Sequence, residues 1–172
     1  MRRIATRATL AALCALLALS ILSGCGAAAT NEADYTAFDA PFVMTATYTA
    51  GHLTGALVYR GNASENFSLE YLSPDSVASL KLTNAEGAVT SEFLGIVSQT
   101  QFAELSSDHP LKAISGCIAK FCAEKPEPQA GKDGRREYNL SDGGKLVFAN
   151  GVLCAAEMPA QGLSLKVTGF DV

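Results

Sequence analysis

The stretch Phe42-Val43-Met44-Thr45-Ala46-Thr47-Tyr48-Thr49 decides the fold of this chain. The side chains at positions 42, 44, 46 and 48 are apolar or aromatic, and three of the four others are threonines. Successive side chains of a β-strand point to opposite faces, so alternation with period two is typical of a strand with one buried face. The stretch therefore predicts a half-buried strand.

The residues that follow repeat this alternation of apolar and polar side chains at short intervals. Turns that contain glycine, as at Gly51 and Gly61, separate runs of alternating apolar and polar residues. The next predicted strands are residues 53–60, 67–71, 81–83, 88–94 and 96–101. Short strands at intervals of about 8–12 residues predict an antiparallel, mainly β surface.

One segment, residues 110–124, has the 3.6-residue periodicity of a helix instead. Ser107 or Asp108 can cap its start, and Pro110 suits its first turn. Its apolar face consists of Leu111, Ile114, Ile118, Phe121 and Cys122. Gly116 in the middle of this helix costs about 1 kcal/mol against alanine, so we expect a close neighbour there.

Four further strands close the chain, at residues 135–140, 144–149, 152–158 and 163–170. Asn150-Gly151 between the second and third of them is a strong signal for a two-residue hairpin. Strands, one amphipathic helix and more strands suit a curved antiparallel sheet with the helix across its concave face. We therefore predict one mainly β (α+β) domain of this kind over residues 41–172.

The N-terminus has the parts of a bacterial lipoprotein signal peptide. Three arginines accompany an apolar run at residues 8–22, which is shorter than the roughly 20 residues of a transmembrane helix. Leu22-Ser23-Gly24-Cys25 then matches a lipobox. We expect cleavage after residue 24 and transfer of diacylglyceryl to Cys25. Two acyl chains, such as palmitate, hold a protein on a membrane stably where one holds it marginally.

Residues 25–40 are mostly small, polar or acidic and indicate a flexible tether with two solubility charges, Asp34 and Asp39. We expect the domain on the outer face of the cytoplasmic membrane, or at the outer membrane in a cell with two membranes. Loss of residues 1–24 changes the formal charge from −4 to −7, because three arginines and no acid are removed. An acidic, exported domain is a poor nucleic-acid binder.

The sequence carries no recognisable catalytic or metal-binding constellation. Neither His52 nor His109 has further ligands at metal-site spacing, and no serine lies in a nucleophile elbow. We therefore expect neither an enzyme nor a cofactor. Cys117, Cys122 and Cys154 are an odd set, which favours buried thiols, and a bridge from Cys154 to either of the others stays open.

Lys132, Arg135 and Arg136 form a basic cluster in an otherwise acidic domain. Such runs are usually solvated loops, which is the interpretation we favour. A sharper hypothesis has them meet anionic lipid headgroups beside a cavity mouth, each cation adding up to about 1 kcal/mol.

Several stretches of the chain resemble the LolA/LolB-like lipoprotein-localisation fold. They are Leu69-Glu70-Tyr71-Leu72-Ser73-Pro74 running on to Leu80, Phe93-Leu94-Gly95-Ile96, and Tyr138-Asn139-Leu140, Gly151-Val152-Leu153 and residues 167–170 of the closing strands. The resemblance covers roughly residues 42–172. It implies a half-barrel around a hydrophobic cavity for acyl chains. Relatives of this family carry lipoproteins, glycolipids or other lipids across the envelope.

On this resemblance, the first hypothesis is a non-catalytic binder or carrier that holds lipid or another hydrophobic ligand between sheet and helix. The expected cavity-lining residues are Phe42, Met44, Leu57, Phe67, Leu69, Ile114, Ile118, Phe121, Phe148 and Leu165. The second hypothesis is a packed envelope domain that senses or scaffolds a protein partner. An open apolar cavity favours the first, and a filled core with an exposed apolar patch favours the second.

Overall fold

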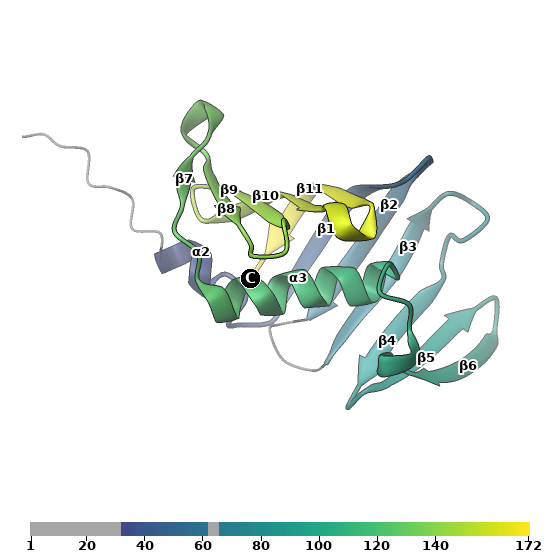
Figure 1. The fold of residues 1–172 in the computed structure, drawn as a ribbon. Coiled ribbons are helices and arrows are strands. Elements are labelled where there is room, and N and C mark those ends of the chain that lie inside the picture. Colours follow the sequence, from purple (N-terminus) through teal and green to yellow (C-terminus); the bar gives the residue numbers. More distant parts are fainter. Residues whose placement is uncertain (1–31, 62–65) are drawn as a thin grey trace, which may run out of the picture. The chain divides into compact units, whose positions relative to one another are not determined.

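The computed structural model describes residues 32–61 and 66–172 (Figure 1). The expected signal peptide, Cys25 and the start of the expected tether lie outside the described residues, and what the sequence predicts of them stays a prediction. The helices and strands are α2 (Glu32–Thr36), β1 (Phe42–Ala50), β2 (Leu53–Gly61), β3 (Phe67–Ser73), β4 (Lys81–Ala85), β5 (Ala88–Phe93), β6 (Ile96–Gln101), α3 (Pro110–Glu124), β7 (Gln129–Ala130), β8 (Arg136–Asn139), β9 (Lys145–Ala149), β10 (Val152–Met158) and β11 (Leu163–Asp171).

Within the described residues, eleven strands form one antiparallel sheet in the order β6-β5-β4-β3-β2-β1-β11-β10-β9-β8-β7. The first and last strands of the domain meet at its centre, where β1 pairs with β11 from Val43 opposite Asp171 to Ala50 opposite Leu163. The chain passes from one sheet edge, β6, to the other, β7, through α3. Figure 1 shows α3 lying across the inner face of the curved sheet.

The predicted mainly β fold, with one substantial helix across the sheet, is confirmed. The predicted helix coincides with α3, and the four predicted closing strands are found as β8 to β11. Asn150 and Gly151 form the turn between β9 and β10, both with positive φ, at 53° and 81°. These elements follow from local patterns because each hairpin joins strands that are neighbours in the sequence.

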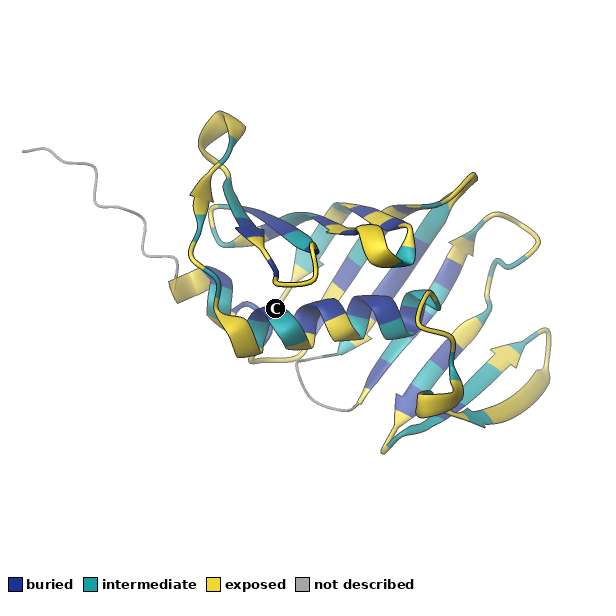
Figure 2. Ribbon diagram, viewed as in Figure 1, coloured by how far each residue is buried: buried dark blue, intermediate teal, exposed yellow. Residues whose placement is uncertain are grey.

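One stripe of α3 closes the inner face of the sheet. Leu111, Ile114, Ile118 and Phe121 are each at most 3% exposed, as their spacing predicts. Full burial of a side chain of this size stabilises a fold by about 1.5–3 kcal/mol. Figure 2 shows the buried residues along α3 and along the central strands behind it.

The domain begins earlier than the sequence suggests, because α2 is part of it. Asp34 on α2 is completely buried and is therefore not a solubility charge. Arg136 donates to its carboxylate through Nε at 2.5 Å and Nη2 at 2.7 Å, and the Tyr138 hydroxyl donates at 2.6 Å. A buried carboxylate is stable only with such partners, so these bonds fix α2 to β8.

Phe38 holds the same segment from its other side. Its completely buried ring lies 5.1 to 6.1 Å, between centroids, from four other phenylalanine rings, which it meets edge to face. They are Phe42, Phe121, Phe148 and Phe170. Edge-to-face pairs contribute about 0.5–1.5 kcal/mol beyond the area they bury. The prediction of a flexible tether up to residue 40 is therefore wrong from α2 onward.

Candidate ligand-binding site

The ten residues expected to line a cavity are all buried in the core. Met44, Ile114, Ile118 and Leu165 surround a space of about 10 Å³ beneath α3, which is near the minimum for one water molecule. The others, Phe42, Leu57, Phe67, Leu69, Phe121 and Phe148, pack among further buried side chains. The structure has a close-packed core where the sequence suggests a cavity, and a ligand role for these ten residues stays a prediction.

An open pocket of about 550 Å³ lies at the start of α3 instead. Its lining comes from β1 to β5, the β3–β4 turn and residues 108–110 at the start of α3, and includes none of the ten expected residues. The lining residues are Tyr48, Ala50, Leu53, Tyr71, Pro74, Ser76, Val77, Leu80, Leu82, Ser91, Asp108, His109 and Pro110. Sites for one small ligand have volumes of about 300–1,000 Å³, so this pocket is large enough for one.

The apolar wall of the open pocket rests on fixed backbone. The β3–β4 turn carries Val77 and Leu80, and the Leu80 N–H donates to the Val77 carbonyl at 2.9 Å. The Tyr71 N–H donates to the Leu80 carbonyl at 3.0 Å, which holds the turn against β3. Leu82 adds a buried side chain to the wall, and Leu53 one that is 56% exposed. These backbone hydrogen bonds hold the turn in place as part of the pocket wall.

Two tyrosines, from β1 and β3, line the pocket. Tyr48 and Tyr71 are 7% and 9% exposed, and their rings meet edge to face at 5.8 Å. Tyr48 lies opposite Gly55 on β2, where an added Cβ would come within 2.8 Å of the Tyr48 hydroxyl and 2.3 Å of the Ser73 carbonyl. A side chain at position 55 would therefore require both the Ser73 backbone and the Tyr48 ring to shift.

The two tyrosine hydroxyls are available to a ligand. In the part of the chain that the structure describes, neither the Tyr48 nor the Tyr71 hydroxyl makes a hydrogen bond to a protein group. Burial, with a smaller contribution from Tyr48, raises the pKa of Tyr71 to about 12, and burial also raises the pKa of Tyr48. Both hydroxyls therefore stay protonated near neutral pH and can each donate and accept a hydrogen bond.

The start of α3 forms the opposite wall. His109, and not the expected Ser107 or Asp108, is the N-cap residue, because its Nδ1 accepts a hydrogen bond from the Leu111 N–H at 3.2 Å. Burial lowers the pKa of His109, so the imidazole is neutral near pH 7, as this acceptor role requires. Asp108 accepts a hydrogen bond from the Ser106 hydroxyl instead.

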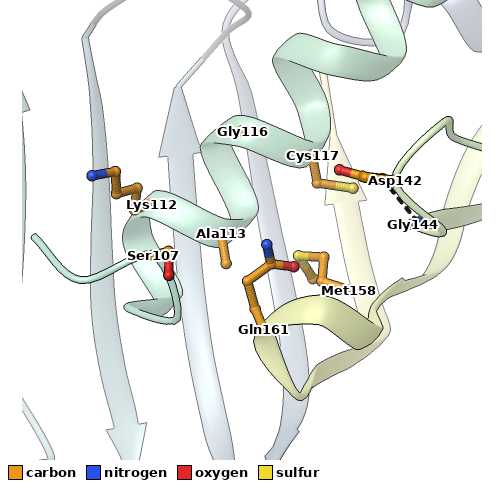
Figure 3. Close-up of a pocket in the computed structure, with 9 residues that line it drawn as sticks. All are labelled: Ser107, Lys112, Ala113, Gly116, Cys117, Asp142, Gly144, Met158 and Gln161. Carbon is orange, nitrogen blue, oxygen red and sulfur yellow. Dashed lines mark hydrogen bonds between the residues drawn. The ribbon is translucent and has the colours of Figure 1, made fainter. Parts of the chain in front are cut away.

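A second pocket, of about 240 Å³, lies where α3 faces the β8–β9 turn and the turn after β10 (Figure 3). Figure 3 shows Ala113, Cys117, Met158 and Gln161 directed into this space, with Lys112 extending away from it. Burial raises the pKa of the Cys117 thiol to about 12, so it is protonated near neutral pH and is not a nucleophile. No chemical role follows from the residues that line this second pocket.

Gly116 lies beside the second pocket and has no close neighbour. A Cβ added there would meet no atom of the described residues within 4 Å, so the prediction of a close neighbour at Gly116 is wrong.

Cys117, Cys122 and Cys154 are free thiols, which excludes the bridge that the sequence leaves open. His52 is exposed in the β1–β2 turn.

The basic cluster of the sequence is divided by the fold. Arg136 belongs to the buried ion pair with Asp34, so the prediction of a solvated charge is wrong for it. Lys132 and Arg135 are exposed.

Across residues 32–61 and 66–172, no three metal-ligating side chains come together, and no helix is long and apolar enough to cross a membrane.

The tip of the β5–β6 hairpin is an exposed apolar patch. Leu94, Ile96 and Val97 are 80%, 72% and 61% exposed. Leu94 has a φ of 50° and Gly95 one of 80°, which suits a two-residue hairpin turn. Positive φ is rare for a leucine, and a polar residue would be better accommodated at this solvated turn. β6 is a sheet edge, and its sequence, Ile96–Gln101, contains no charge.

The two pocket tyrosines cannot be identified from the sequence, because each of them has an ordinary place in its own strand. Tyr48 and Tyr71 satisfy the alternation of β1 and β3, which predicts burial but not what covers a residue. Their common position at the start of α3 follows from the pairing of three strands and from where the helix begins. Gly55 within a strand is the one local signal, since such a glycine often marks a close approach of another group.

The fold is shared with a solved structure of unassigned role. The crystal structure of an uncharacterized conserved protein from Thermus thermophilus has a TM-score of 0.50 at 12% identity, over 81% of this chain and 83% of that one. The crystal structure of LolA superfamily protein NE2245 from Nitrosomonas europaea has a TM-score of 0.41 at 10% identity, over 82% of this chain and 90% of that one. No family model and no curated protein matches this chain. At 12% identity, the likeness to the Thermus protein shows the fold alone.

Proposed function

We propose that this chain is a membrane-anchored extracytoplasmic lipoprotein whose domain binds a hydrophobic ligand, an acyl chain above all, in the open pocket. The observation that carries the proposal is the pocket itself, which has a volume of about 550 Å³ and a wall that includes leucine, valine and tyrosine side chains. Covering apolar surface contributes about 25 cal/mol per Å². The mechanism is binding and release, without a chemical step. The resemblance of the sequence to lipid-carrying half-barrels supports the same proposal.

The anchor in this proposal is diacylglyceryl on Cys25, supported by the lipobox and the signal-peptide pattern. Cys25→Ser removes the thiol that would be acylated. Cells labelled with a clickable palmitate analogue should therefore label the native chain and not the variant, and the variant should leave the membrane fraction. Equal labelling of the two chains would refute the anchor.

Ligand binding is tested by filling the pocket. Ser91 on β5 lies opposite Leu82 and faces the pocket, whereas the adjacent Thr90 points to the other face of the sheet. Ser91→Trp therefore places an indole in the pocket, and Thr90→Trp is the matched control. Both proteins are extracted from membranes in a detergent-free polymer and compared with the native chain by native mass spectrometry.

We expect a non-covalent hydrophobic molecule to be bound to the native chain and to the Thr90→Trp variant. The Ser91→Trp variant should have lost this molecule. The chain has no tryptophan, so the fluorescence of each variant comes from its new indole alone. A blue-shifted emission from Ser91→Trp would report that its indole occupies the apolar pocket. Absence of any bound molecule from the native chain, or its retention in Ser91→Trp, would contradict the proposal.

The β5–β6 tip supports a second candidate function, docking of an envelope protein partner. Leu94, Ile96 and Val97 form an exposed apolar patch at the start of the uncharged edge strand β6, and such patches often mark contact sites. A photo-crosslinking residue at position 94 should then capture one defined protein in cells. The Leu94→Asp/Ile96→Asp variant should lose its membrane complexes and keep the pocket ligand. Loss of the ligand and retention of the complexes would favour the opposite assignment.

A further inference from the structure

We propose, building on the proposed ligand binding, that the Tyr48 and Tyr71 hydroxyls hold the uncharged, hydroxyl- or ester-bearing headgroup of a single-chain amphiphile such as a monoacylglycerol. Both side chains are more than nine-tenths buried and line the open pocket. A ligand that covered these two hydroxyls without bonding to them would leave them unsatisfied, which costs about 1–3 kcal/mol for each group in protein mutational data. The pocket is therefore built to receive a molecule that can both accept and donate hydrogen bonds at this point.

The charges around the pocket decide the kind of headgroup. Its lining contains one carboxylate, Asp108, and neither lysine nor arginine. His109 is neutral near pH 7, and its Nδ1 is already occupied by the Leu111 N–H. An anionic headgroup would thus meet a like charge and no cation, which makes its desolvation unfavourable.

Lys112, in the first turn of α3, does not supply the missing cation. Its Nζ donates to the carbonyls of Ala103 at 3.1 Å and Leu105 at 2.8 Å, and lies 5.8 Å from the centre of the Phe102 ring. It lines the second pocket and not the open one. The open pocket therefore offers neutral polar groups, which match ester and hydroxyl oxygens.

The rest of the open pocket fits one chain. Leu53, Val77, Leu80 and Leu82 give it an apolar wall on the side of the sheet and the β3–β4 turn. A volume of about 550 Å³ corresponds to one small ligand and not to a molecule with several acyl chains. Polar groups that fix orientation within a mostly apolar wall are the usual arrangement of such sites.

The test uses the full chain reconstituted in phosphatidylcholine vesicles. Palmitoylglycerol, palmitic acid, hexadecyltrimethylammonium and hexadecane are each supplied with a diazirine near the chain end, and crosslinked pocket peptides are quantified by mass spectrometry. The variants are the double change Tyr48→Phe/Tyr71→Phe and, as a matched control, Tyr59→Phe, which removes the hydroxyl of a buried tyrosine that does not line the pocket. Thermal melts of all three chains establish that the rings still pack.

We expect palmitoylglycerol to label the native pocket about tenfold more than palmitic acid, the effect of two hydrogen bonds. The double variant should lose about that factor for palmitoylglycerol and keep its labelling by hexadecane, and Tyr59→Phe should match the native chain. Preference for palmitic acid or for the cationic probe, or an unchanged double variant, would overturn the inference while hexadecane labelling upholds the proposed function. Absence of pocket labelling by every probe would overturn the proposed function itself.

Discussion

The two ends of α3 face the same sheet, yet one end is closed and the other is open. At the C-terminal end, Phe121 packs against Phe148 and Phe38, and Tyr35 of α2 donates its hydroxyl to the Pro126 carbonyl at 2.7 Å. At the N-terminal end, Tyr48 and Tyr71 face a pocket of about 550 Å³. Segment α2 covers the first end, and within the described residues no segment covers the second. One helix is thus too short to close this sheet, and the open end is where a ligand fits.

The largest expected effect comes from removing Phe38 at the closed end. Phe38→Ala should lower the free energy of unfolding by about 3–5 kcal/mol, because the buried ring leaves a cavity among four others. Leu80→Ala at the open end should cost roughly 1 kcal/mol, since that side chain is only half-buried. Urea denaturation of both variants measures the contrast. Equal losses would mean that the two ends do not differ in packing.

Removal of one partner of the Asp34–Arg136 pair should have the next largest effect. Arg136→Met leaves the Asp34 carboxylate completely buried with the Tyr138 hydroxyl as its main remaining donor. We expect the free energy of unfolding to fall by about 3 kcal/mol, which is near the lower end of the range for breaking a buried ion pair. Asp34→Asn leaves instead an arginine whose side chain is 18% exposed and can reach water, so it should cost less. The reverse order of the two urea midpoints would contradict this account.

Tryptophan at matched places should separate the filled space from the open one. Ile118→Trp adds volume beneath α3, where the space is about 10 Å³, and overpacking should cost about 1–3 kcal/mol. Ser91→Trp adds the same ring at the open pocket and should leave the melting temperature nearly unchanged. A well-tolerated Ile118→Trp would show instead that the core opens, as the first sequence hypothesis requires.

The sequence predicts the sheet and the helix well because both are local patterns. Alternation gives each strand, the turn residues give each hairpin, and the spacing of Ile114 and Ile118 gives the buried face of α3. The role of Asp34 is different in kind, because its partner Arg136 lies 102 residues away. In the sequence, Asp34 is one acid in a polar stretch, and only the docking of α2 on β8 makes it a buried charge.

The site is less predictable than the fold for the same reason. Periodicity identifies the residues that face inward, such as Met44 and Tyr48 on β1, but not which of them the helix covers. That depends on the residue at which α3 begins, and the sequence offers Ser107 or Asp108 as its cap. Here the cap is His109, so that Met44 lies in the core with Ile114 and Ile118, whereas Tyr48 borders the open pocket.

The smallest expected effect is a pH dependence located at the open end. Burial lowers the pKa of His109 in the folded domain below the value of about 6.5 that it has in the unfolded chain. The unfolded state therefore binds more protons as the pH falls through that value, so stability from this residue is present above about pH 6.5 and is lost below it. Protonation of Nδ1 also removes the acceptor of the Leu111 N–H.

His109→Asn keeps a capping oxygen and does not titrate, so its urea midpoint should fall less than that of the native chain between about pH 7.5 and 5.5. Asp108 beside it, whose pKa is lowered chiefly by the Ser106 hydroxyl, stays ionised in both chains over this range. An identical fall in the two midpoints would show that the open end of α3 does not respond to pH through His109.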